Sequence, residues 1–302
     1  MSILETDIFV RAYTEPPNWK PKVFRPAGFE FDLTSDWQII FDTETTVDAV
    51  QKLRFGFAQV RYAGTLKHEV IFVADDLLDT DLAVILDYAA ANKLDVIQVE
   101  DFRRKIILDI GYLANGSIIG FNLPFDIARI ATYAGVARGS MYGGFTFRLT
   151  PWESDPNIRV KRLNPTSALI DFAAPGKPKQ ARSMRKRNVK SESNRGSFID
   201  VKTIAAALLT GRYSLAALAK RLNTPTQKHA TEEHGGPVTP EYLDYGRADV
   251  QATWECYDAL AKIYSDFGLS TPLKRILSEA SLGKALLREM NIRPLLRRDH
   301  DA

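Results

Sequence analysis

WQIIFDTETT, residues 37–46, is the stretch on which the interpretation of the fold depends. Its first five residues are largely apolar and predict a buried strand that ends in an acidic cluster. Asp42 and Glu44 are two residues apart, so their side chains leave an extended strand on the same face. Paired carboxylates repel each other unless cations neutralise them, and hard divalent ions suit this task. An Asp-x-Glu pattern occurs by chance about once in a chain this long, so its position after a strand gives it weight.

Two more strands follow closely along the chain. Residues 54–62 (RFGFAQVRY) and 69–74 (EVIFVA) are apolar runs with short connections, which predicts an antiparallel meander of three strands. The spacing of apolar residues over 82–89 then predicts a helix, and residues 102–114 predict a second one. The segment 95–101 between them is assigned to no element.

A second acidic position opens a later helix. The strand of residues 117–121 (SIIGF) leads through Asn122 into LPFDIARIATYAG, where Pro124 suits a helix start and Gly135 a helix end. Asp126 lies in the first turn of this predicted helix. An acid at this position complements the helix dipole and needs no function. Asp126 is therefore a candidate site residue only in combination with the other motifs.

The alternation of helices and strands stops between residues 139 and 197. FTFRL and SALIDFA predict the strands of an inserted hairpin. Four aromatic residues lie on or near its first strand: Tyr142, Phe145, Phe147 and Trp152. Two interpretations stay open, because such rings either stack on bases, as in single-strand binders, or pack the core of the hairpin.

A basic arm over residues 176–197 ends this insertion. It holds eight Lys or Arg residues against the single acid Glu192, a net charge of +7, whereas the whole chain carries +3. One short segment therefore accounts for the basic character of the chain, as expected of an arm that meets phosphates. A solvated loop without a partner has the same composition, so the charge alone does not decide between the two.

A third motif lies on a long helix near the end of the sequence. After a short strand (SFIDV) come two helices (IAAALLTG and SLAALAKRLN), and then a helix from about Pro240 that Gly268 closes. Tyr245 and Asp249 are four residues apart on this helix and so share one face. A last helix is predicted over residues 272–290.

The composition is that of a globular protein with a sizeable core, because the 302 residues are 45% hydrophobic and 25% charged. The chain has no run of about 18 apolar residues and no leader pattern at its start, so we expect a cytoplasmic protein without membrane association. Cys256 is the only cysteine, which excludes an internal disulfide framework and a thiolate zinc site.

The order of the three motifs carries a resemblance to a known family. Asp-x-Glu after the first strand, Asn-x-x-Phe-Asp at a helix start and Tyr-x-x-x-Asp on a late helix resemble the DEDD exonucleases, subgroup with tyrosine. The resemblance covers residues 37–267 and includes SFIDVKT…SLAALAKRLN, which is similar to polymerase-proofreading and ribonuclease D-like members. SEASLGKALLREMNI also resembles the segment after the exonuclease domain of some family B DNA polymerases, although no polymerase catalytic motif is present.

The resemblance implies an α/β, ribonuclease H-like fold with a mixed five-stranded sheet, its first three strands antiparallel, and flanking helices. The inserted hairpin and the basic loop depart from the family pattern. We expect an N-terminal extension over residues 1–36, an exonuclease domain over 37–270 and a C-terminal helix with a tail over 271–302.

The resemblance also implies a two-metal site. Asp42, Glu44 and Asp249 would hold one ion, Asp42 with Asp126 a second about 4 Å away, and Tyr245 would orient the attacking water. Two Mg²⁺ ions are expected, with Mn²⁺ as the alternative, because the ligands are all carboxylate oxygens. Six residues are candidate substrate contacts, three in the motifs and three in the basic arm: Thr45, Asn122, Phe125, Arg185, Lys186 and Arg187.

The function expected from the sequence is a 3′–5′ exonuclease that hydrolyses phosphodiester bonds at the 3′ end of single-stranded or frayed DNA. An RNA 3′ exonuclease is the alternative within the enzyme class, because the metals contact only phosphate and do not report the sugar. An alternative from another class is a catalytically inert nucleic-acid-binding module. The expected partners are therefore DNA or RNA 3′ ends.

Overall fold

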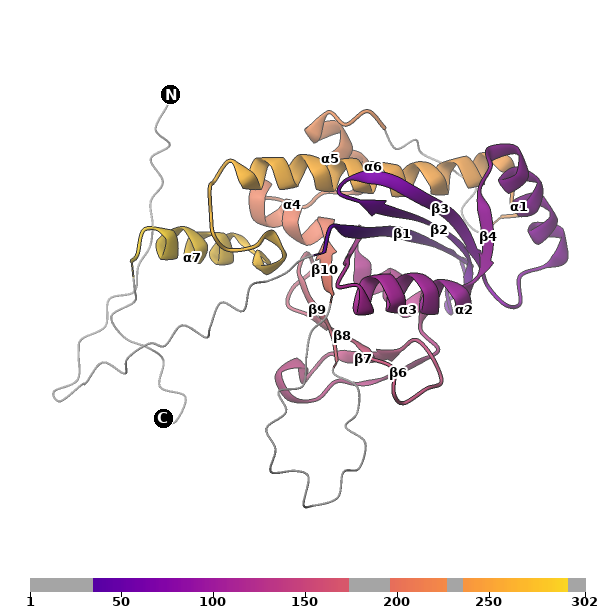
Figure 1. Ribbon diagram of the computed structural model, residues 1–302, viewed down its shortest axis with the longest axis horizontal. Coiled ribbons are helices and arrows are strands. Elements are labelled where there is room, and N and C mark those ends of the chain that lie inside the picture. The colour runs from indigo at the N-terminus through magenta and orange to yellow at the C-terminus, as the bar shows by residue number, and fades with distance from the viewer. Residues whose placement is uncertain (1–34, 174–195, 227–235, 293–302) are drawn as a thin grey trace, which may run out of the picture.

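A six-stranded mixed sheet forms the centre of the computed structural model, which describes residues 35–173, 196–226 and 236–292 (Figure 1). The strand order across the sheet is β10-β5-β1-β2-β3-β4. The strands are β1 (Trp37–Thr45), β2 (Leu53–Tyr62), β3 (Thr65–Val73), β4 (Asp95–Gln98), β5 (Ser117–Gly120) and β10 (Ser197–Asp200).

The first three strands form the antiparallel meander that the apolar runs predict. β1 pairs antiparallel with β2 and β2 with β3, whereas β5 pairs parallel with both β1 and β10. Nearly all residues of β2 are buried on both faces, because helices cover the sheet on both sides. The fold class is therefore α/β with a mixed sheet, antiparallel in its first strands and then parallel.

Four helices cover the face of the sheet to which Ile40 points. They pack on a core that also contains Phe55, Phe57 and Tyr242, and the longest helix, α6, runs the length of the sheet (Figure 1). These helices are α1 (Asp79–Asn92), α4 (Val201–Leu209), α5 (Leu215–Leu222) and α6 (Pro240–Ser265).

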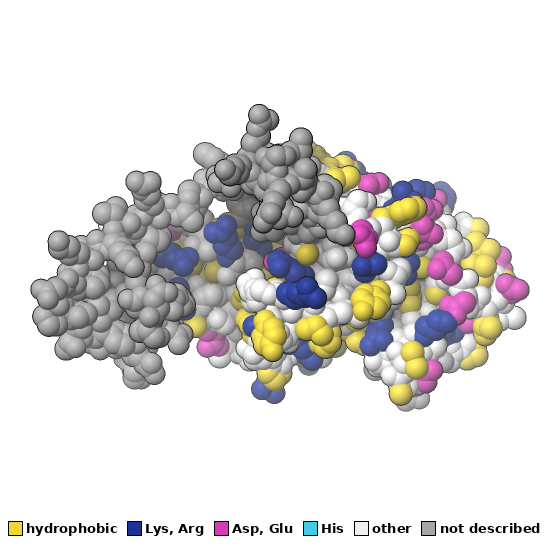
Figure 2. All heavy atoms as spheres, turned by 90° about the horizontal axis from the view of Figure 1, so that it is seen from below, with side chains coloured by type: hydrophobic (Ala, Val, Ile, Leu, Met, Phe, Trp, Pro, Cys, Tyr) yellow, Lys and Arg dark blue, Asp and Glu magenta, His cyan; other side chains and the backbone are white. Residues whose placement is uncertain are grey.

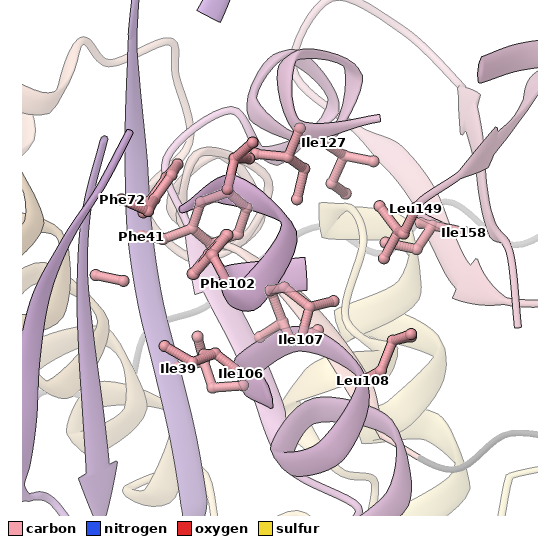
Figure 3. Packing of buried hydrophobic residues seen from close by; sticks show 14 of the residues in the cluster. Ile39, Phe41, Phe72, Phe102, Ile106, Ile107, Leu108, Ile127, Leu149 and Ile158 are labelled. Carbon is pink, nitrogen blue, oxygen red and sulfur yellow. The ribbon is translucent and has the colours of Figure 1, made fainter. Parts of the chain in front are cut away.

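The opposite face, which carries Phe41, packs on α2 (Val99–Asp101), the π-helical η1 (Phe102–Leu113) and α3 (Leu123–Ile130). The rings of Phe72 and Phe102 stack there with their centroids 4.0 Å apart and their planes 5° apart. Figure 3 shows these rings between the sheet and the helix. Stacking of this kind fixes the helix on the sheet, since aromatic pairs contribute beyond their buried area.

A second, smaller sheet lies below this helical layer (Figure 1). Its antiparallel strands, in order, are β6 (Tyr133–Val136), β7 (Phe145–Arg148), β8 (Ile158–Arg162) and β9 (Ala168–Phe172). One face of this sheet joins the same core as Phe41. Figure 3 shows Leu149 and Ile158 reaching that core from the small sheet.

Several expectations about the elements are wrong. The central sheet has six strands and not five, because β4 adds to the edge of β3. The insertion is not a hairpin, since FTFRL and SALIDFA form β7 and β9 and each pairs with β8 between them. The helix that Gly135 was expected to end stops at Ile130, because residues 133–136 pair with β7 instead.

The C-terminal part of the chain also differs from the prediction. The expected helix over residues 272–290 is interrupted, with a 3₁₀ turn at η4 (Leu273–Arg275) and then α7 (Glu279–Glu289), which Ser278 caps. α7 packs on α4, and Ala285 of α7 shares a small buried cluster with Ala207 of α4. Within the described ranges, no helix is long and apolar enough to cross a membrane.

Candidate active site

A cavity of about 900 Å³ opens where the C-terminal end of β1 faces α6. The β1–β2, β5–α3 and α4–α5 connections and the β8–β9 loop form its other walls. The residues that line it are Asp42, Thr43, Glu44, Thr45, Thr46, Val47, Gln51, Phe121, Asn122, Phe125, Pro165, Thr166, Lys202, Arg212, Tyr213, Ser214, Leu215, Tyr242, Tyr245 and Asp249.

Both acids of the first motif reach this cavity from β1. The pleat of the strand puts Asp42 and Glu44 on the face that α6 covers, which is also the face of Ile40. Glu44 is only 8% exposed, and its Oε2 accepts a hydrogen bond of 2.6 Å from the Tyr242 hydroxyl. This bond holds the Glu44 side chain in place.

The third motif faces the same cavity from α6, which begins with Pro240. Tyr245 and the buried Asp249 both line the cavity. Gly246 between them allows the helix to approach the sheet, because a β-carbon there would lie 3.1 Å from Phe57 Cδ2. Four residues of two motifs, Asp42, Glu44, Tyr245 and Asp249, are thus brought together around one space.

Asp126 of the second motif lies behind the cavity wall rather than on it. It is 2% exposed, and its Oδ1 accepts a hydrogen bond of 2.7 Å from Thr43 Oγ1. Thr43 points to the other face of β1 from Asp42 and Glu44, so it links Asp126 to the strand that carries them. Burial raises the pKa of Asp126 to about 8, opposed by the hydrogen bond from Thr43 and assisted by the charge of Asp200.

Asp200, at the end of β10, fixes the turn that presents the second motif. Asn122 precedes α3 in the left-handed region with φ of 71°, and its amide donates a 2.8 Å hydrogen bond to Asp200 Oδ1. Oδ2 of Asp200 accepts a second bond, of 2.9 Å, from Thr203 Oγ1. Burial raises the pKa of Asp200 although both hydrogen bonds lower it.

The candidate substrate contacts divide into two groups. Thr45, Asn122 and Phe125 line the cavity, and the guanidinium of Arg129 lies 4.6 Å from the Phe125 ring centroid. Three further candidates in the basic arm lie outside the described residues: Arg185, Lys186 and Arg187.

Sequence reasoning does not single out several residues of this cavity. Lys202 and Arg212 bring positive charge to its wall, and Tyr213 adds an aromatic ring. Lys202 directly follows SFIDV, and Arg212 and Tyr213 directly precede SLAALAKRLN. These two stretches were identified from the sequence, but these three side chains were not assigned to the site. Tyr242 lies three residues before Tyr245, and helical spacing alone puts the two on one face.

The carboxylates suit a hard divalent cation by their chemistry, since all are oxygen ligands. Asp42, Glu44 and Asp249 share the cavity, while Asp126 bonds to Thr43. In the part of the chain that the structure describes, no three His, Cys, Asp or Glu side chains are gathered into a metal-binding group. The donor set therefore fits such an ion, but its side chains do not form a ready-made cage.

The sequence matches no model of a known protein family and no curated protein.

Proposed function

We propose that this protein is a metal-dependent 3′–5′ exonuclease with a ribonuclease H-like fold. The observation that carries the proposal is that Asp42, Glu44, Tyr245 and Asp249 line one cavity, although β1 and α6 are far apart in the sequence. The sheet supports the fold assignment, because three antiparallel strands are followed across it by β5 and β10, which run parallel to β1.

In this proposal the acids divide between two divalent ions. Asp42, Glu44 and Asp249 would hold one and Asp42 with Asp126 the other, for which the Asp126 side chain would have to turn from Thr43 towards Asp42. Bound ions supply an activated water and stabilise the charge that develops on the phosphodiester. The hydroxyl of Tyr245 would orient the attacking water, and the hydrogen bond from Thr43 holds Asp126 beside β1 in the metal-free protein.

Other side chains of the cavity suit the end of a nucleic acid strand. Lys202 and Arg212 provide positive charge for phosphate oxygens, because charge-assisted hydrogen bonds to phosphate are strong. The rings of Phe125 and Tyr213 are suited to stack against a terminal base. We propose DNA as the substrate, since the C-terminal segment resembles one found after polymerase exonuclease domains.

The test is digestion of single-stranded and duplex oligonucleotides of DNA and RNA that carry a label at the 5′ or the 3′ end. With Mg²⁺, a 5′-labelled strand should give a ladder of shortening products, and a 3′-labelled strand should release labelled mononucleotide at once. Neither the ladder nor the released mononucleotide should appear in EDTA. Preference for RNA would identify the alternative RNA 3′ exonuclease.

The control is the Asp42→Asn variant, purified by the same procedure, because it removes a ligand that both ions share. Equal activity in this variant would trace the cleavage to a contaminating nuclease. Binding of the oligonucleotides without cleavage under all metal conditions would instead identify an inert nucleic-acid-binding module.

A further inference from the structure

One end of the small sheet exposes several large apolar side chains. The exposed fractions are 73% for Val136, 76% for Tyr142, 58% for Phe145 and 49% for Leu163. Contiguous exposed apolar groups on a soluble protein often mark a binding surface. We call this end, with two exposed cations beside it, the sheet-end patch: Val136, Arg138, Tyr142, Phe145, Arg162 and Leu163.

The strand register brings two of these residues, Val136 and Phe145, side by side at this end of the sheet. Val136 of β6 is paired with Phe145 of β7, which is paired with Val160 of β8. The β6–β7 connection packs closely on the end of β8, because a β-carbon on Gly144 would lie 2.3 Å from the Val160 carbonyl oxygen and 2.9 Å from Lys161 Cα. Arg162 and Leu163 follow directly.

The four aromatic residues for which the sequence allowed either base stacking or core packing therefore have different environments. Phe147 is 7% exposed and packs in the core, as the core-packing interpretation predicts. Tyr142 and Phe145 are exposed at the patch, and Trp152 is exposed in the β7–β8 loop at the other end of the strands. Two rings thus remain available to a partner at the patch.

The charge around the patch is positive. Between residues 131 and 172, which hold the small sheet, the chain carries five Lys or Arg residues and three acids, of which Asp171 pairs with Arg159. The other two acids, Glu153 and Asp155, lie in the β7–β8 loop, at the end of the sheet away from the patch. Figure 2, which views the molecule from the side of the small sheet, shows Lys and Arg side chains beside exposed hydrophobic ones. A partner that fits has anionic groups and flat apolar surfaces.

The patch adjoins the candidate active site through the β8–β9 loop. Leu163 begins this loop, and its amide donates a 2.9 Å hydrogen bond to the Ser167 carbonyl, which closes the turn. Pro165 and Thr166 in the same loop line the cavity. The Thr203 hydroxyl, whose proton is shared with Asp200 Oδ2, lies 3.0 Å from the Thr166 carbonyl oxygen and so ties the loop to α4. One short loop therefore has the patch at its start and the cavity wall at its centre.

We propose that the sheet-end patch binds the single-stranded part of a nucleic acid whose 3′ end lies in the cavity. The proposal rests on the exonuclease function proposed above and adds the path of the strand. Tyr142 and Phe145 stack on unpaired bases, and Arg138 and Arg162 contact backbone phosphates. A duplex fits this surface poorly, because its bases are already stacked on each other.

The experiment measures the binding of fluorescently labelled oligo(dT) and oligo(rU) of 16 nucleotides by anisotropy in EDTA, where no cleavage is possible. The double change Tyr142→Ala with Phe145→Ala should weaken binding about tenfold or more, because each stacked base contributes substantially to affinity. The matched control is Trp152→Ala, which removes a ring of equal exposure at the other end of the sheet. It should bind as the wild type does.

A second pair of changes tests the cations. Arg138→Ala with Arg162→Ala should lower the slope of log affinity against log salt by about 0.7 for each lost phosphate contact. Comparison of oligo(dT) with oligo(rU) shows which sugar the surface accepts. Melting temperatures of all variants should stay close to that of the wild type, because every altered side chain is exposed.

The outcomes separate this inference from the proposed enzymatic function. The path over the patch is overturned if the Tyr142 and Phe145 double variant binds with wild-type affinity. It is also overturned if the Trp152 control loses as much affinity as the double variant. Either result holds even if the protein degrades DNA with Mg²⁺. Selective loss in the double variant supports the path even if the wild type cleaves no substrate, in which case only the exonuclease proposal fails.

Discussion

The hydroxyl of Tyr242 on α6 donates a 2.6 Å hydrogen bond to Oε2 of Glu44 on β1. Both residues are buried, and the Tyr242 ring also lies edge-on to Phe55, with 5.4 Å between the centroids. The long helix and the first strand are therefore joined at the candidate active site by a polar bond inside an apolar contact.

Changing Tyr242 to Phe should lower the free energy of unfolding by about 1 to 3 kcal/mol, because Glu44 loses a buried donor while the ring packing is kept. Urea denaturation in EDTA measures this difference. Tyr62→Phe is the control, since Tyr62 is 42% exposed and the change should be within about 0.5 kcal/mol. Equal stability of the two variants would show that the bond contributes nothing.

Tyr245→Phe should have the opposite profile to Tyr242→Phe. Tyr245 lines the cavity, and loss of its hydroxyl should lower the rate at saturating substrate by about 10²-fold through a misplaced water. The variant should remain folded, because the ring keeps its packing against the core. Single-turnover cleavage of a 5′-labelled oligonucleotide gives the rate, and an unchanged rate would remove Tyr245 from the proposed mechanism.

Divalent ions should stabilise the wild type more than Asp249→Asn, which loses a ligand of one of the two proposed ions. A ligand that binds only the folded state raises the free energy of unfolding by about 2.7 kcal/mol at 100 times its dissociation constant. Thermal melting across a Mn²⁺ series detects this shift without any cleavage. Asp258→Asn on the same helix is the control, because Asp258 pairs with Lys262 at the surface. A similar Mn²⁺ shift in both variants would contradict the assigned ligand.

The metal-free protein should become less stable as the pH rises above the usual range of an Asp carboxyl. Burial raises the pKa of Asp200 in the folded state above the value of 3.8 in the unfolded chain, so the folded state holds the proton more tightly. The stability that this preference contributes is fully present below the unfolded pKa and is lost as the pH rises through the folded pKa. The raised pKa of Asp126 acts in the same direction.

Asp200→Asn should reduce this dependence, because the amide stays neutral at every pH and keeps an acceptor for the Asn122 amide. The stability of the variant relative to the wild type should therefore increase steadily above pH 4. Urea denaturation in EDTA at pH 5, 7 and 8.5 provides the comparison. If the free energy of unfolding depends on pH in the same way for both proteins, Asp200 titrates as an ordinary surface acid.

Gly246→Val should destabilise the protein by about 1 to 3 kcal/mol, as overpacking of a core does. Its β-carbon would lie 3.1 Å from Phe57, whose buried ring is 1% exposed and would have to shift. Gly283→Ala on α7 is the matched control, because nothing lies within 4 Å of its β-carbon. That change should stabilise the protein by about 0.5 to 1 kcal/mol through helix propensity. Calorimetric melting of both variants tests the difference in sign.

The burial of a strand explains which parts of the fold could be predicted from the sequence. β1, β2 and β3 have nine or ten residues, so their apolar runs are recognisable locally. β5 and β10 have only four residues each but are buried throughout, whereas the equally short β4 and β6 contain no fully buried residue. They become strands because a neighbour offers a ladder of hydrogen bonds, and no local pattern reports that partner. The same tertiary effect ends α3 before Gly135.

Only the parts of the candidate site that follow from the spacing of residues along the sequence could be predicted. A spacing of two residues on a strand places Asp42 and Glu44 on one face. A spacing of four residues on a helix does the same for Tyr245 and Asp249. Lys202 and Arg212 reach the cavity through the packing of α4 and α5, which no interval encodes. The burial of Asp126 behind β1 likewise depends on how α3 packs.

The hydrogen bond from the Asn122 amide to Asp200 joins the start of α3 to the outermost strand of the central sheet. β10 has four residues and should open in local fluctuations before the inner strands do. Each opening releases the turn that presents Asp126 while β1, β2 and β3 stay paired. On heating, activity should therefore be lost before the protein melts. Hydrogen exchange at the Asn122 amide should follow that earlier, reversible event.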